Sequence, residues 1–235
     1  MTASHASLSS AAESRTALLA GATGLVGRAL WPLLADAARY RRLEVLARRP
    51  LPDVVADSPT VTVRVVDFAD PAAVPPVDDV YIALGTTIKI AGSQAAFRAV
   101  DLDLVVAIAR AARARGATGL AVVSALGADP RSRVFYNRVK GEMEAAVGSL
   151  GYDCVAIARP SLLLGDRAAL GQPVRAFEAL AARLFGPLAV LVPPGVRPIQ
   201  AGDVACALVD ALTIERRPGL QVLSSAQMQK ASPRR

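Results

Sequence analysis

The sequence predicts an α/β fold in which helices cover both faces of a doubly wound parallel sheet. Short apolar runs rich in branched residues alternate with segments of helical periodicity, which is the pattern of repeated strand–helix units. The apolar runs are nearly continuous, as expected for parallel strands that are buried on both faces. A length of 235 residues with 53% hydrophobic residues is sufficient for one domain with a substantial core.

The expected strands and helices follow one another from residue 17 onward. A strand at residues 17–20 leads through a glycine turn into a helix at residues 25–38, which carries Leu30, Leu33 and Leu34 on one face. Five further strands are expected at residues 43–47, 61–66, 80–84, 119–124 and 154–158. Two further helices are expected at about residues 94–115 and 132–150.

Residues 16–235 are expected to form a single domain, with small cap elements at about residues 161–200. The C-terminal part has helical periodicity near residues 174–184 and 204–213, and residues 220–223 are expected to form a last strand. Residues 1–15 carry no apolar periodicity. We therefore expect a disordered leader whose deletion leaves stability nearly unchanged.

Composition and charge argue against several classes of protein. The formal net charge is +7, but the basic residues are scattered, so we do not expect a nucleic-acid partner. Cys154 and Cys206 lie in apolar segments. Two such cysteines cannot form the dense disulfide framework of small secreted domains, which predicts a cytoplasmic protein. No apolar run is long enough to span a membrane. The single histidine, His5, lies in the leader, which argues against a Ser–His–acid hydrolase and a His-based metal site.

A glycine turn at residues 21–27, GATGLVG, comes directly after the first strand and opens a helix. In this context the glycines allow a tight turn, close approach of a pyrophosphate and close helix packing, which predicts a Rossmann-type dinucleotide site. The alternative is a turn without a ligand. A Walker A loop fits poorly, because no Lys followed by Ser or Thr comes after the last glycine. The expected cofactor contacts of this segment are Gly21, Thr23, Gly24, Leu25, Val26 and Gly27.

The end of the second strand predicts the nucleotide. About 20 residues after the turn, an acidic side chain would select the ribose 2′-hydroxyl of NAD(H). Arg48 and Arg49 stand there instead, which favours the 2′-phosphate of NADP(H) over NAD(H). A solvated arginine pair at a strand end is the alternative.

The ends of the third and fourth strands should also face the cofactor, because ligands of open sheets bind at the carboxyl ends of the strands. Asp67 and Phe68 would lie beside the adenine, and Leu84, Gly85 and Thr86 would lie along the cofactor. The alternative for Asp67 is a helix cap, and the alternative for Gly85 is an ordinary turn.

Tyr136 and Lys140 lie four residues apart on an expected helix and so share one face. Tyr136 could exchange a proton with a substrate carbonyl or hydroxyl group, while Lys140 holds the ribose and favours loss of that proton. Ser124, at the end of the preceding strand, could hold the substrate oxygen. By itself a Tyr–Lys pair of this spacing is usually an ordinary surface pair.

Together with the glycine turn, four segments resemble a known family: ALGTT at residues 83–87, SALGAD at 124–129, YNRVKGE at 136–142 and RPSLLL at 159–164. The chain is similar to the short-chain dehydrogenase/reductase superfamily in its atypical branch, and especially to the Tat-interacting-protein group, over about residues 16–213. The resemblance implies an NADP-binding reductase or epimerase, although some members are regulatory binders. It also implies that Pro160, Ser161 and Leu163 flank the nicotinamide, unless they form a loop wall without ligand contact.

One position departs from the family pattern. Many members have an Asn on the helix after the fourth strand that completes a proton relay, and Asp101 is the nearest counterpart here. An Asp can position water but changes the charge, and a solvated helix residue is the alternative.

Two functional classes remain after these arguments. The first is an NADPH-dependent reductase, dehydrogenase or epimerase acting on a small carbonyl, alcohol or sugar-like substrate, with no metal. The second is a non-catalytic NADP(H)-sensing module that regulates a protein partner. The sequence favours the first class.

Overall fold

The computed structural model describes residues 15–36, 38–51, 60–66, 70, 73–165, 193 and 195–231. The strands of the main sheet are β1 Thr16–Ala20, β2 Arg42–Ala47, β3 Val61–Val65, β4 Asp79–Ile82, β5 Gly119–Val123, β6 Cys154–Arg159 and β9 Gly219–Ser224. The helices are α2 Leu25–Ala35, α3 Ile88–Ala91, α4 Gln94–Arg98, the π-helix η3 Ala99–Leu104, α5 Val105–Ala114, α6 Phe135–Gly148, α8 Ala201–Thr213 and α9 Ser225–Ala231. A second, two-stranded sheet pairs β7 Leu163–Leu164 with β8 Ile199–Gln200.

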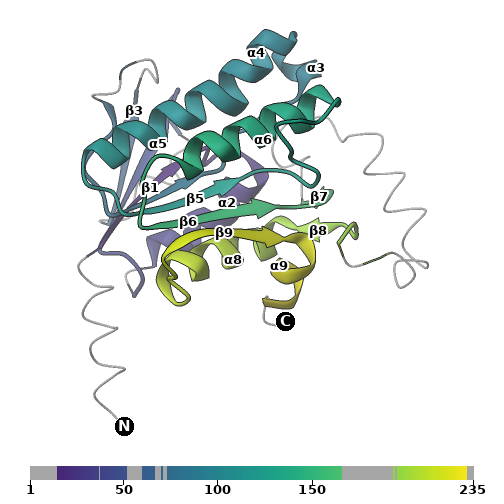
Figure 1. Cartoon of the computed structure of the whole chain (residues 1–235). Coiled ribbons are helices and arrows are strands. Elements are labelled where there is room, and N and C mark those ends of the chain that lie inside the picture. Colours follow the sequence, from purple (N-terminus) through teal and green to yellow (C-terminus); the bar gives the residue numbers. More distant parts are fainter. Residues whose placement is uncertain are drawn as a thin grey trace.

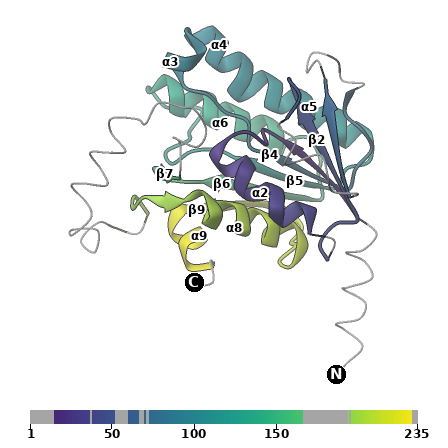
Figure 2. The same ribbon diagram turned by 180° about the vertical axis from the view of Figure 1, so that it is seen from behind.

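All seven strands of the main sheet are parallel, in the order β3-β2-β1-β4-β5-β6-β9. The strand order reverses between β1 and β4, which is the switch point of a doubly wound sheet. Helices α4, α5 and α6 cover one face of the sheet and α8 covers the other (Figure 1). The view from behind shows α2 beside α8 on that second face (Figure 2). The predicted fold class is confirmed.

Two apolar clusters, one on each face, hold the helices against the sheet. On the first face, Val139, Met143 and Val147 of α6 are fully buried, at the four-residue spacing that places side chains on one side of a helix. On the second face, Val204 and Leu208 of α8 repeat the same spacing. Burial of each such side chain stabilises the fold by about 1.5–3 kcal/mol.

A polar network closes the amino ends of the strands, away from the carboxyl ends. The fully buried Asp79 accepts hydrogen bonds from Arg15 at 2.6 Å, Arg216 at 2.8 Å and the Tyr40 hydroxyl at 2.9 Å. Residue 119 must be glycine, because a Cβ there would lie 2.0 Å from an Asp79 oxygen. The network ties the start of β1 to the segment before β9.

The structure differs from the predicted elements mainly at their ends. The expected strand at residues 80–84 ends at Ile82, and the expected helix at 25–38 ends at Ala35, where the backbone of Asp36 becomes extended. The expected helix at residues 94–115 is three consecutive segments, α4, η3 and α5, because a π turn interrupts the α-helical hydrogen-bond pattern. The short elements α3, β7, β8 and α9 were not predicted. The expected leader, except Arg15, and the expected helix at residues 174–184 lie outside the described residues.

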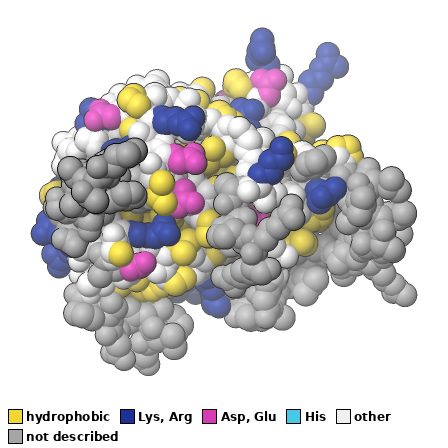
Figure 3. All heavy atoms as spheres, turned by 90° about the horizontal axis from the view of Figure 1, so that it is seen from below, with side chains coloured by type: hydrophobic (Ala, Val, Ile, Leu, Met, Phe, Trp, Pro, Cys, Tyr) yellow, Lys and Arg dark blue, Asp and Glu magenta, His cyan; other side chains and the backbone are white. Residues whose placement is uncertain are grey.

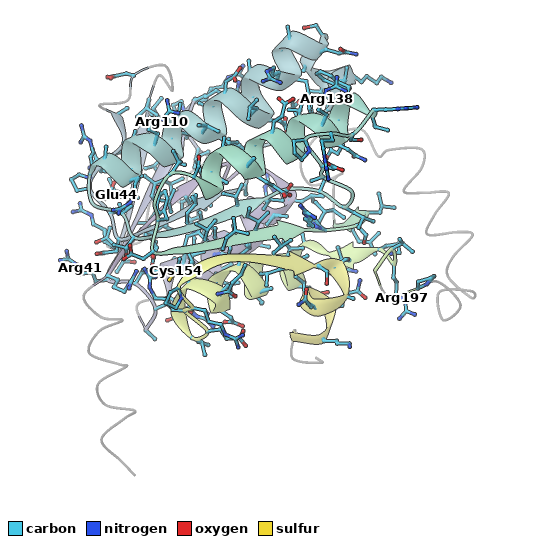
Figure 4. All side chains as sticks on the ribbon, in the orientation of Figure 1. Arg41, Glu44, Arg110, Arg138, Cys154 and Arg197 are labelled. Atoms are coloured by element: carbon cyan, nitrogen blue, oxygen red, sulfur yellow. The ribbon has the colours of Figure 1, made fainter. Side chains whose placement is uncertain are left out.

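The described surface shows mixed charge. On the face seen in Figure 3, Lys and Arg side chains are dispersed, and Asp and Glu side chains lie among them. Within the described ranges, no helix is long and apolar enough to cross a membrane, and no group of three or more His, Cys, Asp or Glu side chains could hold a metal ion. Cys154, at the start of β6 (Figure 4), is a buried free thiol.

Candidate functional site

A cleft of about 640 Å³ opens at the carboxyl ends of β1, β4, β5 and β6. It lies across the switch point of the sheet, where open α/β proteins bind their ligands. Most of the predicted site residues line it: Gly21, Thr23, Gly24, Leu25, Val26, Arg48, Leu84, Gly85, Thr86, Ser124, Tyr136, Lys140, Pro160, Ser161 and Leu163. The structure therefore brings together residues from segments far apart in the sequence.

Two glycines of the turn are required by the packing of the protein itself. Gly21 has φ +94°, and a Cβ there would lie 2.6 Å from the carbonyl carbon of Ala83. A Cβ on Gly27 would lie 2.0 Å from the carbonyl oxygen of Gly21, so α2 could not approach the turn as closely. Gly27 thus packs beneath the turn and does not line the cleft.

Gly24 differs, because the protein has room for a side chain there. A Cβ on Gly24 would make only ordinary contacts, 3.6 Å from the Gly21 oxygen and 3.7 Å from the Ala83 oxygen. Gly24 is the N-cap of α2 and, having no side chain, leaves the first N–H groups of the helix uncovered. A helix N-terminus open to a cleft favours an anion such as pyrophosphate. The turn therefore fits a dinucleotide.

The two arginines after β2 are placed differently. Both side chains are exposed, but Arg48 lines the cleft and Arg49 does not. Asp67 and Phe68 lie outside the described residues. Arg48 is therefore the arginine that could contact a nucleotide at this end.

The loop after β4 is held by Asp101. The backbone N–H of Thr86 donates to one Asp101 carboxylate oxygen at 2.9 Å, and the Lys140 ammonium lies 2.7 Å from the other. Asp101 is buried, so it is not a solvated helix residue. It connects the β4 loop to α6 across the cleft.

Tyr136 and Lys140 lie on one face of α6, as the spacing predicts. Tyr136 is half-buried, and its ring packs against Phe97 with the ring centroids 5.4 Å apart. Lys140 is buried one turn further along. Both side chains line the cleft together with Ser124, which follows β5 directly.

Sequence reasoning missed Glu144, the next residue on this face of α6. Its carboxylate accepts a hydrogen bond from the Ser124 hydroxyl at 2.5 Å. Arg159, at the end of β6, donates three further bonds to it at 2.5, 3.0 and 3.2 Å. The hydrogen bond to Glu144 raises the pKa of the Arg159 guanidinium above its ordinary value. The four-residue spacing after Lys140 was the available signal, since it places Glu144 on the same face.

The loop after β6 forms another wall of the cleft. The Pro160 carbonyl accepts a hydrogen bond from the N–H of Leu126 at 2.9 Å, which fixes the start of this wall. The Ser161 hydroxyl donates to the carbonyl of Arg197 and is 2.9 Å from the Ser225 hydroxyl. These bonds attach the wall to the C-terminal part of the fold.

Comparison with known proteins agrees with this geometry. Residues 21–162 match the NAD(P)H-binding family. The mitochondrial protein FMP52 of Eremothecium gossypii is 38% identical over 152 residues, covering 64% of this chain and 67% of the relative. Protein HTATIP2 of Rattus norvegicus is 33% identical over 180 residues, covering 75% of this chain and 72% of the relative.

Solved structures share the fold at low sequence identity. An oxidoreductase of the short-chain dehydrogenase/reductase family from Burkholderia thailandensis superposes with a TM-score of 0.65 at 20% identity, covering 92% of this chain and 93% of that one. MoeE5 in complex with UDP-glucose and NAD superposes with a TM-score of 0.65 at 16% identity, covering 88% and 75%.

The fold and the glycine-lined cleft define a nucleotide-binding Rossmann protein. The chain belongs to the NAD(P)H-binding family and is an atypical short-chain dehydrogenase/reductase-like protein, as the resemblance implied. The prediction of a cytoplasmic protein is contradicted, because the FMP52 relatives are named mitochondrial.

Proposed function

We propose that the chain is an NADP(H)-dependent oxidoreductase that acts on a small carbonyl, alcohol or sugar-like substrate. The observation that carries this proposal is that Ser124, Tyr136 and Lys140 line the same cleft as the glycine turn. A proton-transferring group therefore stands in the cleft that the nucleotide would occupy. The bound nicotinamide would supply or accept the hydride.

The preference for NADP(H) rests on the end of β2. Arg48 lines the cleft, and no carboxylate stands at residue 48 or 49 to accept a bond from a ribose 2′-hydroxyl. A guanidinium can hold a 2′-phosphate with fork-like, charge-assisted hydrogen bonds. NADPH should therefore bind more tightly than NADH.

Tyr136 is the candidate proton donor, and Lys140 is the candidate ribose ligand. The contact with Phe97 limits the positions of the Tyr136 ring and keeps the phenol at the cleft wall. An ammonium has three N–H donors, so Lys140 can keep its bond to Asp101 and still donate to ribose hydroxyls.

The test is a panel of carbonyl compounds with NADPH, followed by stopped-flow NADPH oxidation. Tyr136→Phe keeps the ring and removes the acid, so turnover should fall by ~10² or more while NADPH affinity stays nearly unchanged. Lys140→Ala should reduce both. Equal rates for the native and Tyr136→Phe proteins on the same substrate would show that Tyr136 is not the acid.

A second candidate is a non-catalytic NADP(H) sensor that acts through a protein partner. It is favoured by two contacts, because Asp101 neutralises the charge of Lys140 and the Ser124 hydroxyl already donates its hydrogen bond to Glu144. In a sensor, Tyr136→Phe should cost about 0.5–1.5 kcal/mol of nucleotide affinity. Every compound of the panel should then fail to oxidise NADPH.

A further inference from the structure

An ion pair lies inside the cleft, on the side opposite the arginine end. The Lys140 ammonium and the Asp101 carboxylate are 2.7 Å apart, and their side chains are only 4% and 1% exposed. Asp101 belongs to η3, where it and Leu102 are the buried residues. π turns inside helices are frequent at functional sites.

The charges around this pair cancel. Glu144, one turn beyond Lys140, is paired with Arg159. Among the cleft-lining residues that the structure describes, Arg48, Asp101 and Lys140 are the charged ones. Arg48 lies at the end of β2, away from Tyr136 and Ser124. The charged side chains near Tyr136 and Ser124 are therefore Asp101 and Lys140, whose charges sum to zero.

The glycine turn orients a dinucleotide in this cleft. Its pyrophosphate would meet the N-terminus of α2 and its adenosine end would meet Arg48. The nicotinamide would then lie toward Tyr136, Lys140 and Asp101. This ring carries a positive charge in NADP⁺ and none in NADPH, so its two redox states respond differently to nearby charge.

We infer that Asp101 cancels the charge of Lys140 and thereby allows the cleft to bind the cationic, oxidised cofactor. The inference rests on the proposed nucleotide site and adds selectivity between redox states to it. With Lys140 alone, a desolvated positive charge would stand at the nicotinamide end and repel NADP⁺ but not NADPH. Asp101 is thus a specificity-determining residue for the cofactor's redox state.

The experiment measures the dissociation constants of NADP⁺ and NADPH by calorimetry. In Asp101→Asn the nicotinamide end of the cleft becomes positive, so the ratio Kd(NADP⁺)/Kd(NADPH) should rise about tenfold or more, because the unit charge lies a few ångströms away in a partly buried site and repels only the oxidised ring. In Lys140→Met the cleft end becomes negative, so the ratio should fall by a similar factor. The double variant is neutral again and should restore the native ratio, even if both nucleotides bind more weakly.

Asp103→Asn is the matched control, because Asp103 lies on the same π turn but is exposed and does not line the cleft. Its ratio should equal the native one. If the pair were purely structural, each substitution would weaken the binding of NADP⁺ and NADPH equally. An unchanged Kd ratio in Asp101→Asn and Lys140→Met therefore overturns the inference. If Asp101→Asn does not fold, Lys140→Met and the double variant still decide. Failure of the native protein to bind either nucleotide would overturn the proposed function itself.

Discussion

The Ser124 hydroxyl donates its hydrogen bond to the Glu144 carboxylate, with the two oxygens 2.5 Å apart. A hydroxyl has one proton and two lone pairs, so Ser124 can only accept hydrogen bonds from a group in the cleft. A partner there must be a donor, such as the hydroxyl of an alcohol substrate or the phenol of Tyr136. Glu144 therefore determines what Ser124 can hold.

We expect Glu144→Gln to lower the free energy of unfolding by about 1.5–3 kcal/mol, because it removes the charge from hydrogen bonds with Ser124 and Arg159. The control is Glu142→Gln on the same helix, whose partner Arg98 is 45% exposed. A surface pair of this kind contributes at most about 1 kcal/mol. Urea denaturation of both variants measures the difference. Equal losses would mean that the Glu144 network is not a special source of stability.

Replacing Arg48 with Ala should weaken NADPH binding about tenfold or more and change NADH binding little, since only NADPH carries the 2′-phosphate. Arg49→Ala removes the same charge outside the cleft lining, so it should have a smaller effect. Calorimetric titrations of the three proteins with both nucleotides provide the test. The NADP(H) preference is refuted if the native protein binds NADH and NADPH equally.

The two glycines Gly24 and Gly27 should respond oppositely to replacement by Ala. Gly27→Ala places a Cβ 2.0 Å from a backbone oxygen and should destabilise the fold by about 3 kcal/mol or more. Gly24→Ala has room in the protein, so the melting temperature should change little while nucleotide affinity falls. Thermal unfolding with and without NADPH separates the effects. Unchanged affinity in Gly24→Ala would show that the phosphates do not approach this residue.

Features that depend on local spacing were predictable from the sequence. The glycine turn, the strand–helix alternation and the shared face of Tyr136 and Lys140 all follow from neighbouring positions along one segment. The fold class was correct for this reason. Arg48 and Arg49 are adjacent, however, and only the structure shows that Arg48 alone of the two lines the cleft.

Pairings between distant segments could not be predicted in the same way. Whether Asp101 reaches Lys140 depends on the π turn and on how η3 packs against α6, and no spacing within one segment encodes that contact. The bond between Ser124 and Glu144 likewise joins the end of β5 to the middle of α6. Both contacts change the expected chemistry, because they determine which charges and protons remain available in the cleft.

The buried tyrosines predict how stability depends on alkaline pH. Burial raises the pKa of Tyr152 above its ordinary value, and its hydroxyl donates to the Ala109 carbonyl at 2.6 Å. Above about pH 10 the unfolded chain loses this proton and the folded protein keeps it, so the unfolding free energy falls as pH rises, by about 1.4 kcal/mol per pH unit for one tyrosine. Tyr152→Phe removes this titrating group, so the decline of the unfolding free energy should be shallower by about 1.4 kcal/mol per pH unit. At neutral pH the variant should be slightly less stable than the native protein, because it lacks the hydrogen bond to Ala109. Urea denaturation at several pH values between neutral and alkaline gives both curves, and parallel curves above pH 10 would contradict the prediction.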